Sequence, residues 1–159
     1  MPDEITRKTR SPEETFALGI ELAKSLRGGD VVVLTGSLGA GKTALVRGIA
    51  SGMRVKSHVS SPTFTLLHLH EAGEEGALPL HHFDLYRLEG ADDFLACGLD
   101  EYIGGDSVSV IEWGDRVRDA LPGQVMEIDV RYGQDPQERI FMIRYPKEWK
   151  AEKGRRAAP

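Results

Sequence analysis

Gly36-Ser-Leu-Gly-Ala-Gly-Lys-Thr43 is the segment of this chain that says most about its fold. Two glycines separated by four residues and followed by Lys and Thr form the pattern of a phosphate-binding loop. Residues 30–35 before it have the apolar, β-branched character of a strand, and residues 44–50 after it have the composition of a helix. A strand, a glycine-rich turn and a helix in this order predict a P-loop NTPase-like α/β core that binds a nucleoside triphosphate.

The residues of this motif have complementary expected roles. The glycines let the backbone turn its N–H groups toward the phosphates, and the N-terminus of the following helix adds partial positive charge there. Lys42 is expected to reach the terminal phosphates and support catalysis, and the Thr43 hydroxyl is expected to ligate a magnesium ion. The predicted nucleotide-binding residues of the motif are Gly36, Ser37, Leu38, Gly39, Ala40, Gly41, Lys42 and Thr43. The alternative, a glycine-rich turn with an incidental lysine, is disfavoured because the motif and its flanking elements agree.

The chain of 159 residues has the composition of one globular domain, with 40% hydrophobic and 28% charged residues. Its net charge of −5 argues against a protein that binds nucleic acid through a broad basic surface. The single nucleotide-binding domain is predicted over residues 1–146, and a basic, flexible tail over residues 147–159. Cys97 is the only cysteine, so no intrachain disulfide is expected. No segment has the apolar length of a signal peptide or a membrane span, so we expect a cytoplasmic protein without membrane contact.

The remaining elements follow from apolar periodicity and turn residues. Ser11, followed by Pro12 and Glu14, predicts a helix N-terminus with a capping box, and Gly28-Gly29 predicts the end of that helix. Further helices are predicted at 92–103 and 116–121, and strands at 66–70, 78–84, 107–113, 126–132 and 140–145. The first two of these strands and the last two are expected to pair as hairpins. The predicted fold is a three-layer α/β core whose parallel strands are extended by antiparallel strands.

Two acidic residues come directly at the ends of predicted apolar strands. Asp84 follows the apolar run 78–83, and Glu112 follows the run 108–111. Ligands of open α/β sheets bind at the carboxyl ends of the strands, where a triphosphate site needs a carboxylate near the metal and a group that orients water. Asp84 and Glu112 are therefore predicted as catalytic and metal-binding residues, in preference to a turn cap and a surface acid. Their spacing leaves open which of the two ligates magnesium directly.

Two weaker signals lie between the motif and these acids. Thr63, in Ser61-Pro-Thr63, occupies a loop position where nucleotide switches place a hydroxyl on the metal or the γ-phosphate, although Ser-Pro-Thr is also ordinary turn chemistry. The first predicted hairpin carries four histidines: His68, His70, His81 and His82. A transition-metal site is disfavoured because these histidines do not match a closed zinc set, and magnesium already has oxygen ligands.

Four segments occur together in a specific order: the motif at 36–43, Ser61-Pro-Thr-Phe-Thr65, His82-Phe-Asp-Leu-Tyr-Arg-Leu88 and Glu112-Trp113. In this combination the chain resembles the TsaE family (formerly YjeE), small bacterial ATPases of tRNA threonylcarbamoyladenosine (t6A) biosynthesis. The resemblance covers the chain from about the first helix to the final hairpin and leaves only the basic tail outside it.

The resemblance implies a cytoplasmic protein that binds ATP and Mg²⁺ and hydrolyses ATP slowly on its own. It implies TsaD and TsaB as protein partners, with tRNA contacted indirectly through their complex. It also implies that ATP turnover resets this complex between rounds, whereas the threonylcarbamoyl group is transferred by the partners.

The resemblance further implies roles for individual residues. Thr43 and Glu112 would lie beside the magnesium ion, and Asp84 would serve at the acidic, water-orienting position. The loop residue of the switch-like position would be Thr63. Two further residues would approach the nucleotide: Trp113 closely, and Ser11 on the side of the base.

Other functions for the same motif are a small-molecule kinase, a guanine-nucleotide switch and a phosphate-binding protein without turnover. A kinase needs an acceptor pocket and usually an arginine-bearing lid, whereas Arg87 is the only arginine within a candidate site motif. Guanine readers generally use an Asn-Lys-x-Asp segment, and this chain contains no asparagine. Asp84 and Glu112 argue against binding without turnover. The kinase is the main alternative to a partner-coupled ATPase.

Overall fold

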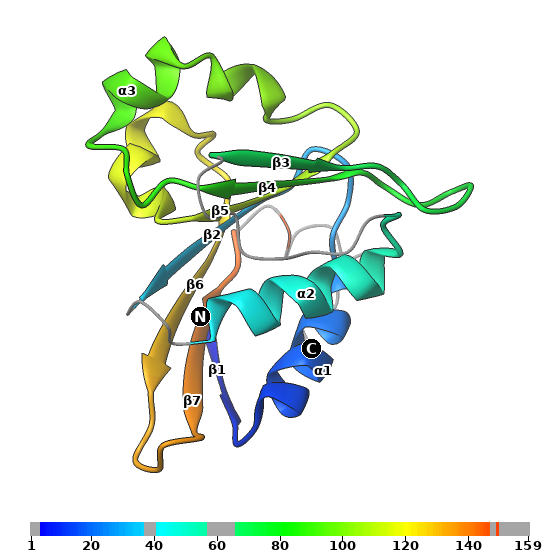
Figure 1. Ribbon diagram of the computed structural model, residues 1–159, viewed down its shortest axis with the longest axis vertical. Coiled ribbons are helices and arrows are strands. Elements are labelled where there is room, and N and C mark those ends of the chain that lie inside the picture. The colour runs from blue at the N-terminus through cyan, green and yellow to red at the C-terminus, as the bar shows by residue number, and fades with distance from the viewer. Residues whose placement is uncertain (1–3, 37–40, 57–65, 147–148, 150–159) are drawn as a thin grey trace.

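The computed structural model describes residues 4–36, 41–56, 66–146 and 149. Within these residues, seven strands form one sheet in the order β1-β7-β6-β2-β5-β4-β3 (Figure 1). The strands are β1 (Glu4–Thr9), β2 (Val31–Gly36), β3 (Leu67–His70), β4 (Leu80–Asp84), β5 (Val108–Glu112), β6 (Met126–Tyr132) and β7 (Arg139–Arg144). The neighbouring strands β6, β2, β5 and β4 are parallel, and β3, β7 and β1 extend them with antiparallel pairing. The predicted α/β sheet of parallel strands extended by antiparallel ones is confirmed.

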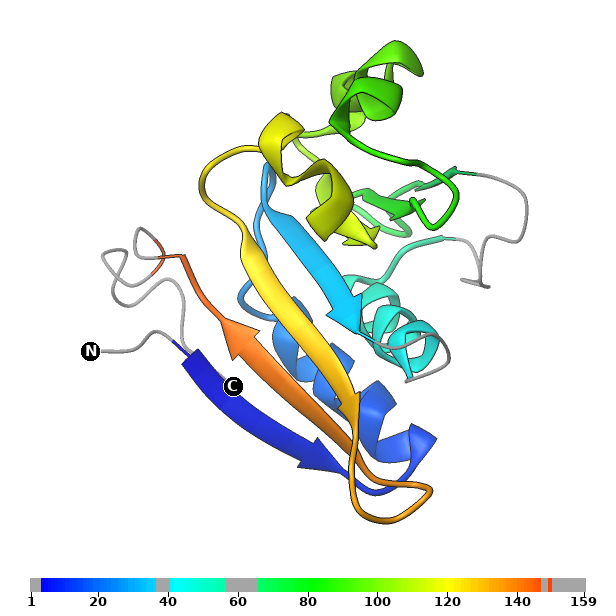
Figure 2. The ribbon, with the colours of Figure 1, turned by 90° about the vertical axis from the view of Figure 1, so that its left-hand side faces the viewer.

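Helices cover both faces of this sheet (Figure 2). On one face lie α1 (Pro12–Ala23) and α2 (Lys42–Met53). On the other face α3 (Ala91–Ala96) and the 3₁₀ helices η1 (Leu99–Tyr102) and η2 (Gly114–Ala120) pack over β2, β5 and β4. The three-layer arrangement expected from the sequence is therefore present, with the second helical layer covering only half of the sheet.

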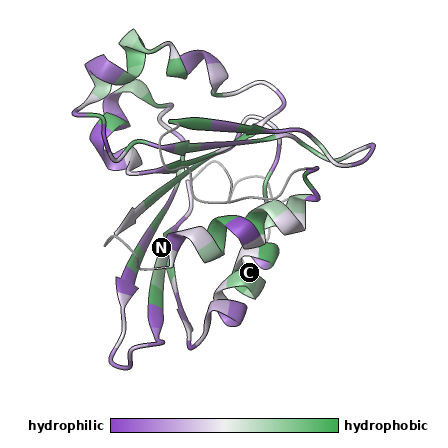
Figure 3. Cartoon of the chain, viewed as in Figure 1, coloured by the Kyte–Doolittle hydropathy of each residue, from purple (hydrophilic) through white to green (hydrophobic). Residues whose placement is uncertain are grey.

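The central strand β2 is buried on both faces because successive residues of a strand point to opposite sides. Val32 and Leu34 join the core beneath α1 and α2, whereas Val31 and Val33 join the core beneath α3 and the 3₁₀ helices. Along β6 the burial alternates instead, with buried residues separated by partly exposed ones. Figure 3 shows the same contrast, with hydrophobic residues in the central strands and hydrophilic ones toward the β6–β7 turn.

The helices α1 and α2 approach each other through glycines. A Cβ atom on Gly48 would lie 2.1 Å from the carbonyl oxygen of Phe16, and one on Gly19 would lie 2.5 Å from the carbonyl oxygen of Leu45. Only glycine allows backbones to pack this closely. The crossing fixes the position of α2, which begins at Lys42.

The observed elements differ from the predicted ones most clearly in three places. Ser11 is the N-cap of α1, as predicted, but the helix ends at Ala23 and not at Gly28-Gly29. Residues 24–26 continue with the i→i+3 hydrogen bonds of a tighter turn, which ends the α-helix early. The single helix expected at 92–103 is interrupted by Gly98, whose φ is +70, and becomes α3 and η1. Periodicity indicated no strand at residues 4–9, where Ile5 is the only apolar residue; β1 forms by pairing with β7.

Trp149 lies in the segment predicted as a flexible tail, yet its side chain is buried and its ring lies 6.1 Å from that of Tyr145. The other residues of 147–159 lie outside the described residues. Among the described helices, none has the combination of length and apolarity that a bilayer crossing requires.

Candidate nucleotide-binding site

Three segments of the predicted site meet at the carboxyl ends of the parallel strands. Gly36 ends β2, Asp84 ends β4 and Glu112 ends β5. In the sheet register, Glu112 pairs with Asp84 on one side and with Leu34 of β2 on the other. Because parallel strands end at the same edge of the sheet, residues far apart in the sequence become neighbours at the place where α/β proteins bind ligands.

Lys42 is buried beside these acids at the start of α2. Its Nζ donates a hydrogen bond to the Gly36 carbonyl oxygen at 3.3 Å and lies 3.9 Å from the centroid of the Trp113 ring. Burial lowers the pKa of Lys42, and the carboxylates of Glu112 and Asp84 oppose this shift. An ammonium group in such surroundings interacts more strongly with an anionic ligand than it would in water.

The two carboxylates have different environments. Asp84 is half-buried and accepts a hydrogen bond from the Tyr86 N–H at 3.2 Å. Burial raises the pKa of Asp84; the Tyr86 N–H partly offsets this, and the charge of Glu112 adds to it. Glu112 is only 5% exposed, and its Oε2 lies 2.6 Å from Nε2 of His82. One acid is therefore held by a buried partner, whereas the other is less well stabilised in its charged form.

The sequence placed His82 among the hairpin histidines and in the segment 82–88, but predicted no role for it in the site. Its side chain is completely buried, and it lies on β4 two residues before Asp84, hence on the same face of the strand. A sequence signal for this role does exist: a histidine lies inside a predicted buried strand, two residues before a candidate acid. On a strand, that spacing places both side chains on one face.

The other histidines of the hairpin have separate contacts. His81 is hydrogen-bonded through Nδ1 to the Tyr102 carbonyl oxygen at 2.7 Å, and the rings of His68 and His70 lie 6.0 Å apart. In the described parts of the chain, no group of three or more His, Cys, Asp or Glu residues is arranged to hold a metal ion.

Trp113 brings an aromatic and cationic cluster to the site. Its backbone has φ +64, and its ring lies 5.2 Å from the Tyr86 ring and 5.0 Å from the guanidinium carbon of Arg116. Arg116 also donates hydrogen bonds to the carbonyl oxygens of Tyr86 and Leu88. Arg116 therefore connects the loop after β4 to η2, which follows β5. Neither Tyr86 nor Arg116 was assigned a role from sequence spacing, because only the strand order brings them together.

Of the remaining predicted site residues, the structure describes Gly41, Thr43 and Ser11 and does not describe the others. Gly41 is the N-cap residue of α2 with φ +102, a conformation that favours glycine, and Thr43 is half-buried in the first turn. Ser11 accepts a hydrogen bond from the Glu14 N–H as the cap of α1, and its approach to a nucleotide base stays a prediction. The predicted site residues outside the described residues are Ser37, Leu38, Gly39, Ala40 and Thr63.

The donor atoms at this edge of the sheet suit magnesium. In triphosphate sites Mg²⁺ takes one or two carboxylates and completes its octahedral shell with phosphate oxygens and waters. The hydroxyl of Thr43 lies in the first turn of α2, and the carboxylates of Asp84 and Glu112 end neighbouring strands. These are hard oxygen donors, which fit Mg²⁺ better than a transition metal.

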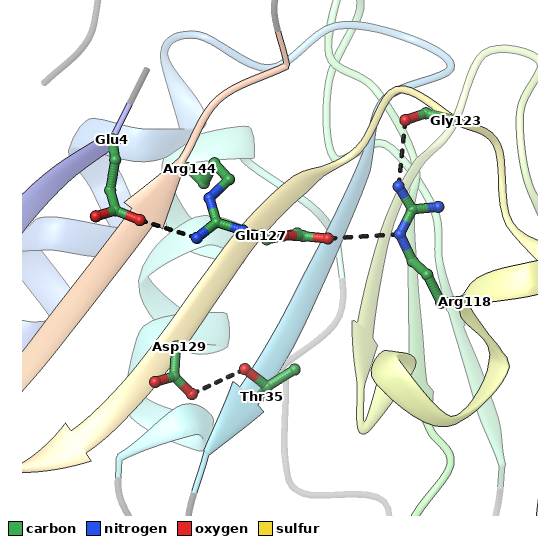
Figure 4. A network of polar contacts seen from close by, with 7 residues as sticks. All are labelled: Glu4, Thr35, Arg118, Gly123, Glu127, Asp129 and Arg144. Carbon is green, nitrogen blue, oxygen red and sulfur yellow. Dashed lines mark hydrogen bonds and ion pairs between the residues drawn. The ribbon is translucent and has the colours of Figure 1, made fainter. Parts of the chain in front are cut away.

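The half of the sheet that the second helical layer leaves uncovered carries an open polar groove of about 420 Å³. Figure 4 shows its polar network, which comprises Glu4, Thr35, Arg118, Gly123, Glu127, Asp129 and Arg144. Arg144 bridges the carboxylates of Glu4 and Glu127, at 3.1 Å from each. The Thr35 hydroxyl donates to Asp129 at 2.9 Å and so links β2 to β6 directly before the glycine-rich motif. The arginines of the groove are paired with its own carboxylates, which makes it a solvated ion-pair network.

Comparisons with known proteins agree on one family. The family model described as "Threonylcarbamoyl adenosine biosynthesis protein TsaE" matches residues 9–141. The tRNA threonylcarbamoyladenosine biosynthesis protein TsaE of Treponema pallidum is 41% identical over 132 residues, which cover 83% of this chain and 95% of that protein. The TsaE protein of Bacillus subtilis is 40% identical over 135 residues, covering 84% of this chain and 82% of that protein.

A solved structure shares the fold as well. The crystal structure of YdiB from Bacillus superposes with a TM-score of 0.75 at 31% sequence identity, covering 95% of this chain and 92% of that one. The region that the family model matches, residues 9–141, contains the strands and helices that form the site described above. The family model, the curated relatives and the shared fold together show that this chain belongs to the TsaE family of threonylcarbamoyl adenosine biosynthesis proteins.

Proposed function

We propose that this chain is a Mg²⁺-dependent ATPase of t6A biosynthesis, which acts with the TsaB–TsaD complex and drives its turnover without transferring the threonylcarbamoyl group itself. The observation that supports the proposal most strongly is the meeting of Lys42, Asp84 and Glu112 at the carboxyl ends of β2, β4 and β5. Membership of the TsaE family supplies the biosynthetic context.

Lys42 is the group that binds the terminal phosphates in this proposal. Its Nζ now contacts the neutral Gly36 carbonyl and the face of the Trp113 ring. Phosphate oxygens would offer the same ammonium group charge-assisted hydrogen bonds, which are about twice as strong as neutral ones. Lys42 would therefore exchange these contacts for the nucleotide, and Trp113 would remain beside it.

Thr43 and Glu112 would hold the magnesium ion, which when bound neutralises charge on the β- and γ-phosphates. Asp84 suits the water-orienting position because burial raises its pKa, which makes its carboxylate a better proton acceptor than an exposed aspartate. In this position Asp84 would accept a hydrogen bond from the attacking water and direct its lone pair toward the γ-phosphate.

The decisive experiment measures ATP hydrolysis by the purified chain alone, with TsaB–TsaD, and with TsaB–TsaD plus tRNA. We expect slow hydrolysis alone and a stimulation by the partners of about tenfold or more. The Lys42→Ala variant, assayed with the same partners, should show no stimulation. Turnover that depends strictly on a metabolite, with phosphate transferred to it, would instead support the small-molecule kinase.

A further inference from the structure

His82 is a buried polar group of the site to which the proposed ATPase mechanism gives no role. Its side chain is 0% exposed and that of Glu112 is 6% exposed, so their 2.6 Å contact lies inside the protein. The two residues stand on the neighbouring parallel strands β4 and β5, where His82 pairs with Val110, two residues before Glu112. The contact is therefore built on two rigid elements and not on a loop.

The hydrogen bond between these side chains has a defined direction. A carboxylate accepts hydrogen bonds and does not donate them, so the proton lies on Nε2 of His82. The Nδ1 atom of His82 is buried and has no partner in the described part of the chain. The imidazole thus makes one directed contact, and that contact is with Glu112 Oε2.

The two carboxylate oxygens of Glu112 have different surroundings. Oε2 is committed to His82, whereas Oε1 makes no hydrogen bond to any residue that the structure describes. We propose that His82 is a positioning residue, which holds the Glu112 carboxylate so that Oε2 faces the imidazole and Oε1 is available to the magnesium ion of the nucleotide. The inference rests on the proposed function and adds to it the group that orients its metal-binding carboxylate. Partners of this kind commonly change metal affinity by about 10- to 100-fold when they are removed.

A purely structural histidine would behave differently. Its loss would lower the stability of the fold and weaken nucleotide binding whether or not magnesium is present. The loss of a positioning residue should weaken only the part of nucleotide binding that depends on magnesium. This difference separates the two roles.

The experiment compares three variants with wild type by calorimetric ATP titration, once in EDTA and then over a series of Mg²⁺ concentrations. His82→Phe keeps a planar ring but removes the donor, and His82→Gln keeps an N–H donor. His81→Phe is the matched control, because it makes the same exchange on the same strand at a residue that contacts Tyr102. Thermal unfolding of each variant checks that it is folded.

We expect His82→Phe to raise the Mg²⁺ concentration for half-maximal enhancement of ATP binding by about tenfold or more, with affinity in EDTA unchanged. His82→Gln and His81→Phe should stay within about threefold of wild type, since the first retains a donor and the second leaves the Glu112 contact intact. A folded His82→Phe variant with the wild-type Mg²⁺ dependence, or with equal losses in EDTA and in Mg²⁺, would overturn the positioning role alone. A wild-type protein without any Mg²⁺-dependent ATP binding would overturn the proposed function as well.

A second measurement on the wild-type protein tests the same inference if His82→Phe does not fold. Long-range ¹H–¹⁵N spectra of the histidine rings should show a proton on Nε2 of His82, the atom that contacts Glu112. A proton on Nδ1 with Nε2 bare would contradict a bond donated to Glu112 and would remove the positioning role.

Discussion

In the candidate site, a buried lysine lies close to two carboxylates of opposite charge. Lys42 is 4% exposed, and a buried ammonium group costs free energy unless anionic groups compensate for it. The carboxylates of Asp84 and Glu112 provide this compensation, while burial shifts the pKa of Lys42 down and that of Asp84 up. Opposite shifts of neighbouring groups in one place are typical of sites that bind ligands or catalyse reactions.

Lys42→Ala is expected to lower ATP affinity by about 100-fold, because the substitution removes the only ammonium group placed for charge-assisted bonds to phosphate at this edge of the described sheet. Isothermal titration calorimetry measures the affinity, and circular dichroism checks the fold. Lys56→Ala is the matched control, since Lys56 is an exposed lysine that pairs only weakly with Glu71 at 3.9 Å. Unchanged ATP affinity in Lys42→Ala would contradict the assignment of the phosphate-binding residue.

Asp84→Asn is expected to abolish hydrolysis and to raise thermal stability at neutral pH. The folded-state pKa of Asp84 is raised above its unfolded value, so the stability gained from the neutral carboxyl is complete below the unfolded pKa and lost as pH rises through the folded pKa. Asparagine is neutral at every pH. The variant should therefore melt about 2–4 °C above wild type at pH 7, with the difference shrinking as the pH falls toward about 4 and staying constant below that.

Thermal unfolding followed by circular dichroism over this pH range measures the effect. A melting-point difference that does not change between pH 7 and pH 4 would show that the Asp84 charge is not its source. Asp135→Asn, which changes an exposed aspartate in the β6–β7 turn, should leave both stability and hydrolysis close to wild type.

At the scale of elements, the site depends on how α2 is held against α1 and how the strands end. The crossing of α1 and α2 allows no side chain at Gly48, whose Cβ would overlap the Phe16 carbonyl. The same crossing places the first turn of α2, with Lys42 and Thr43, at the carboxyl end of β2. Arg116 adds a second restraint by binding the loop after β4 from η2.

Gly48→Ala is expected to destabilise the protein by about 2–4 kcal/mol. In a helix without neighbours the same substitution would be favourable by about 1 kcal/mol, so a net loss shows that the steric overlap at the crossing dominates. Denaturant unfolding measures the change. Gly123→Ala is the control, because no heavy atom of the described residues, its two sequence neighbours aside, lies within 4 Å of the position of its Cβ. Its effect should stay within about 0.5 kcal/mol. A stabilised Gly48→Ala variant would mean that α1 and α2 separate at little cost.

At the scale of the whole molecule, the sheet joins two cores that support the site from opposite faces. The core beneath α1 and α2 contains Val32 and Leu34 of β2, and the core beneath α3, η1 and η2 contains Phe83 of β4 and Ile111 of β5. The site residues stand at the ends of these same strands. Ligand binding at this edge should therefore stabilise the cooperative unit as a whole.

Saturating ATP with Mg²⁺ is expected to raise the melting temperature of the wild-type chain. A ligand present at 100 times its dissociation constant stabilises the folded state by about 2.7 kcal/mol, which corresponds to about 5–10 °C for a domain of this size. Differential scanning calorimetry measures the shift, and Lys42→Ala should show little of it. A wild-type melting point that ATP and Mg²⁺ leave unchanged would argue against a nucleotide site on this sheet.

The features that could be predicted from the amino-acid sequence are those whose signals are local. Glycine spacing in 36–43 predicted the phosphate-binding motif, Ser11 predicted a helix cap, and an acid after each of two apolar runs predicted Asp84 and Glu112. Apolar alternation likewise predicted the β6–β7 hairpin, because a half-buried strand repeats its pattern every two residues. These signals need no knowledge of what lies across the sheet.

Which distant residues share the site depends on the three-dimensional fold. The order β2-β5-β4 places Glu112 between Leu34 and Asp84 and brings His82 against it. The fold also brings Arg116 close to Trp113. The polar segment 4–9 becomes strand β1 because it pairs with the edge of β7. The physical reason is that strand pairing and burial are non-local: they depend on partners up to 140 residues away, as between Glu4 and Arg144, which no short-range pattern encodes.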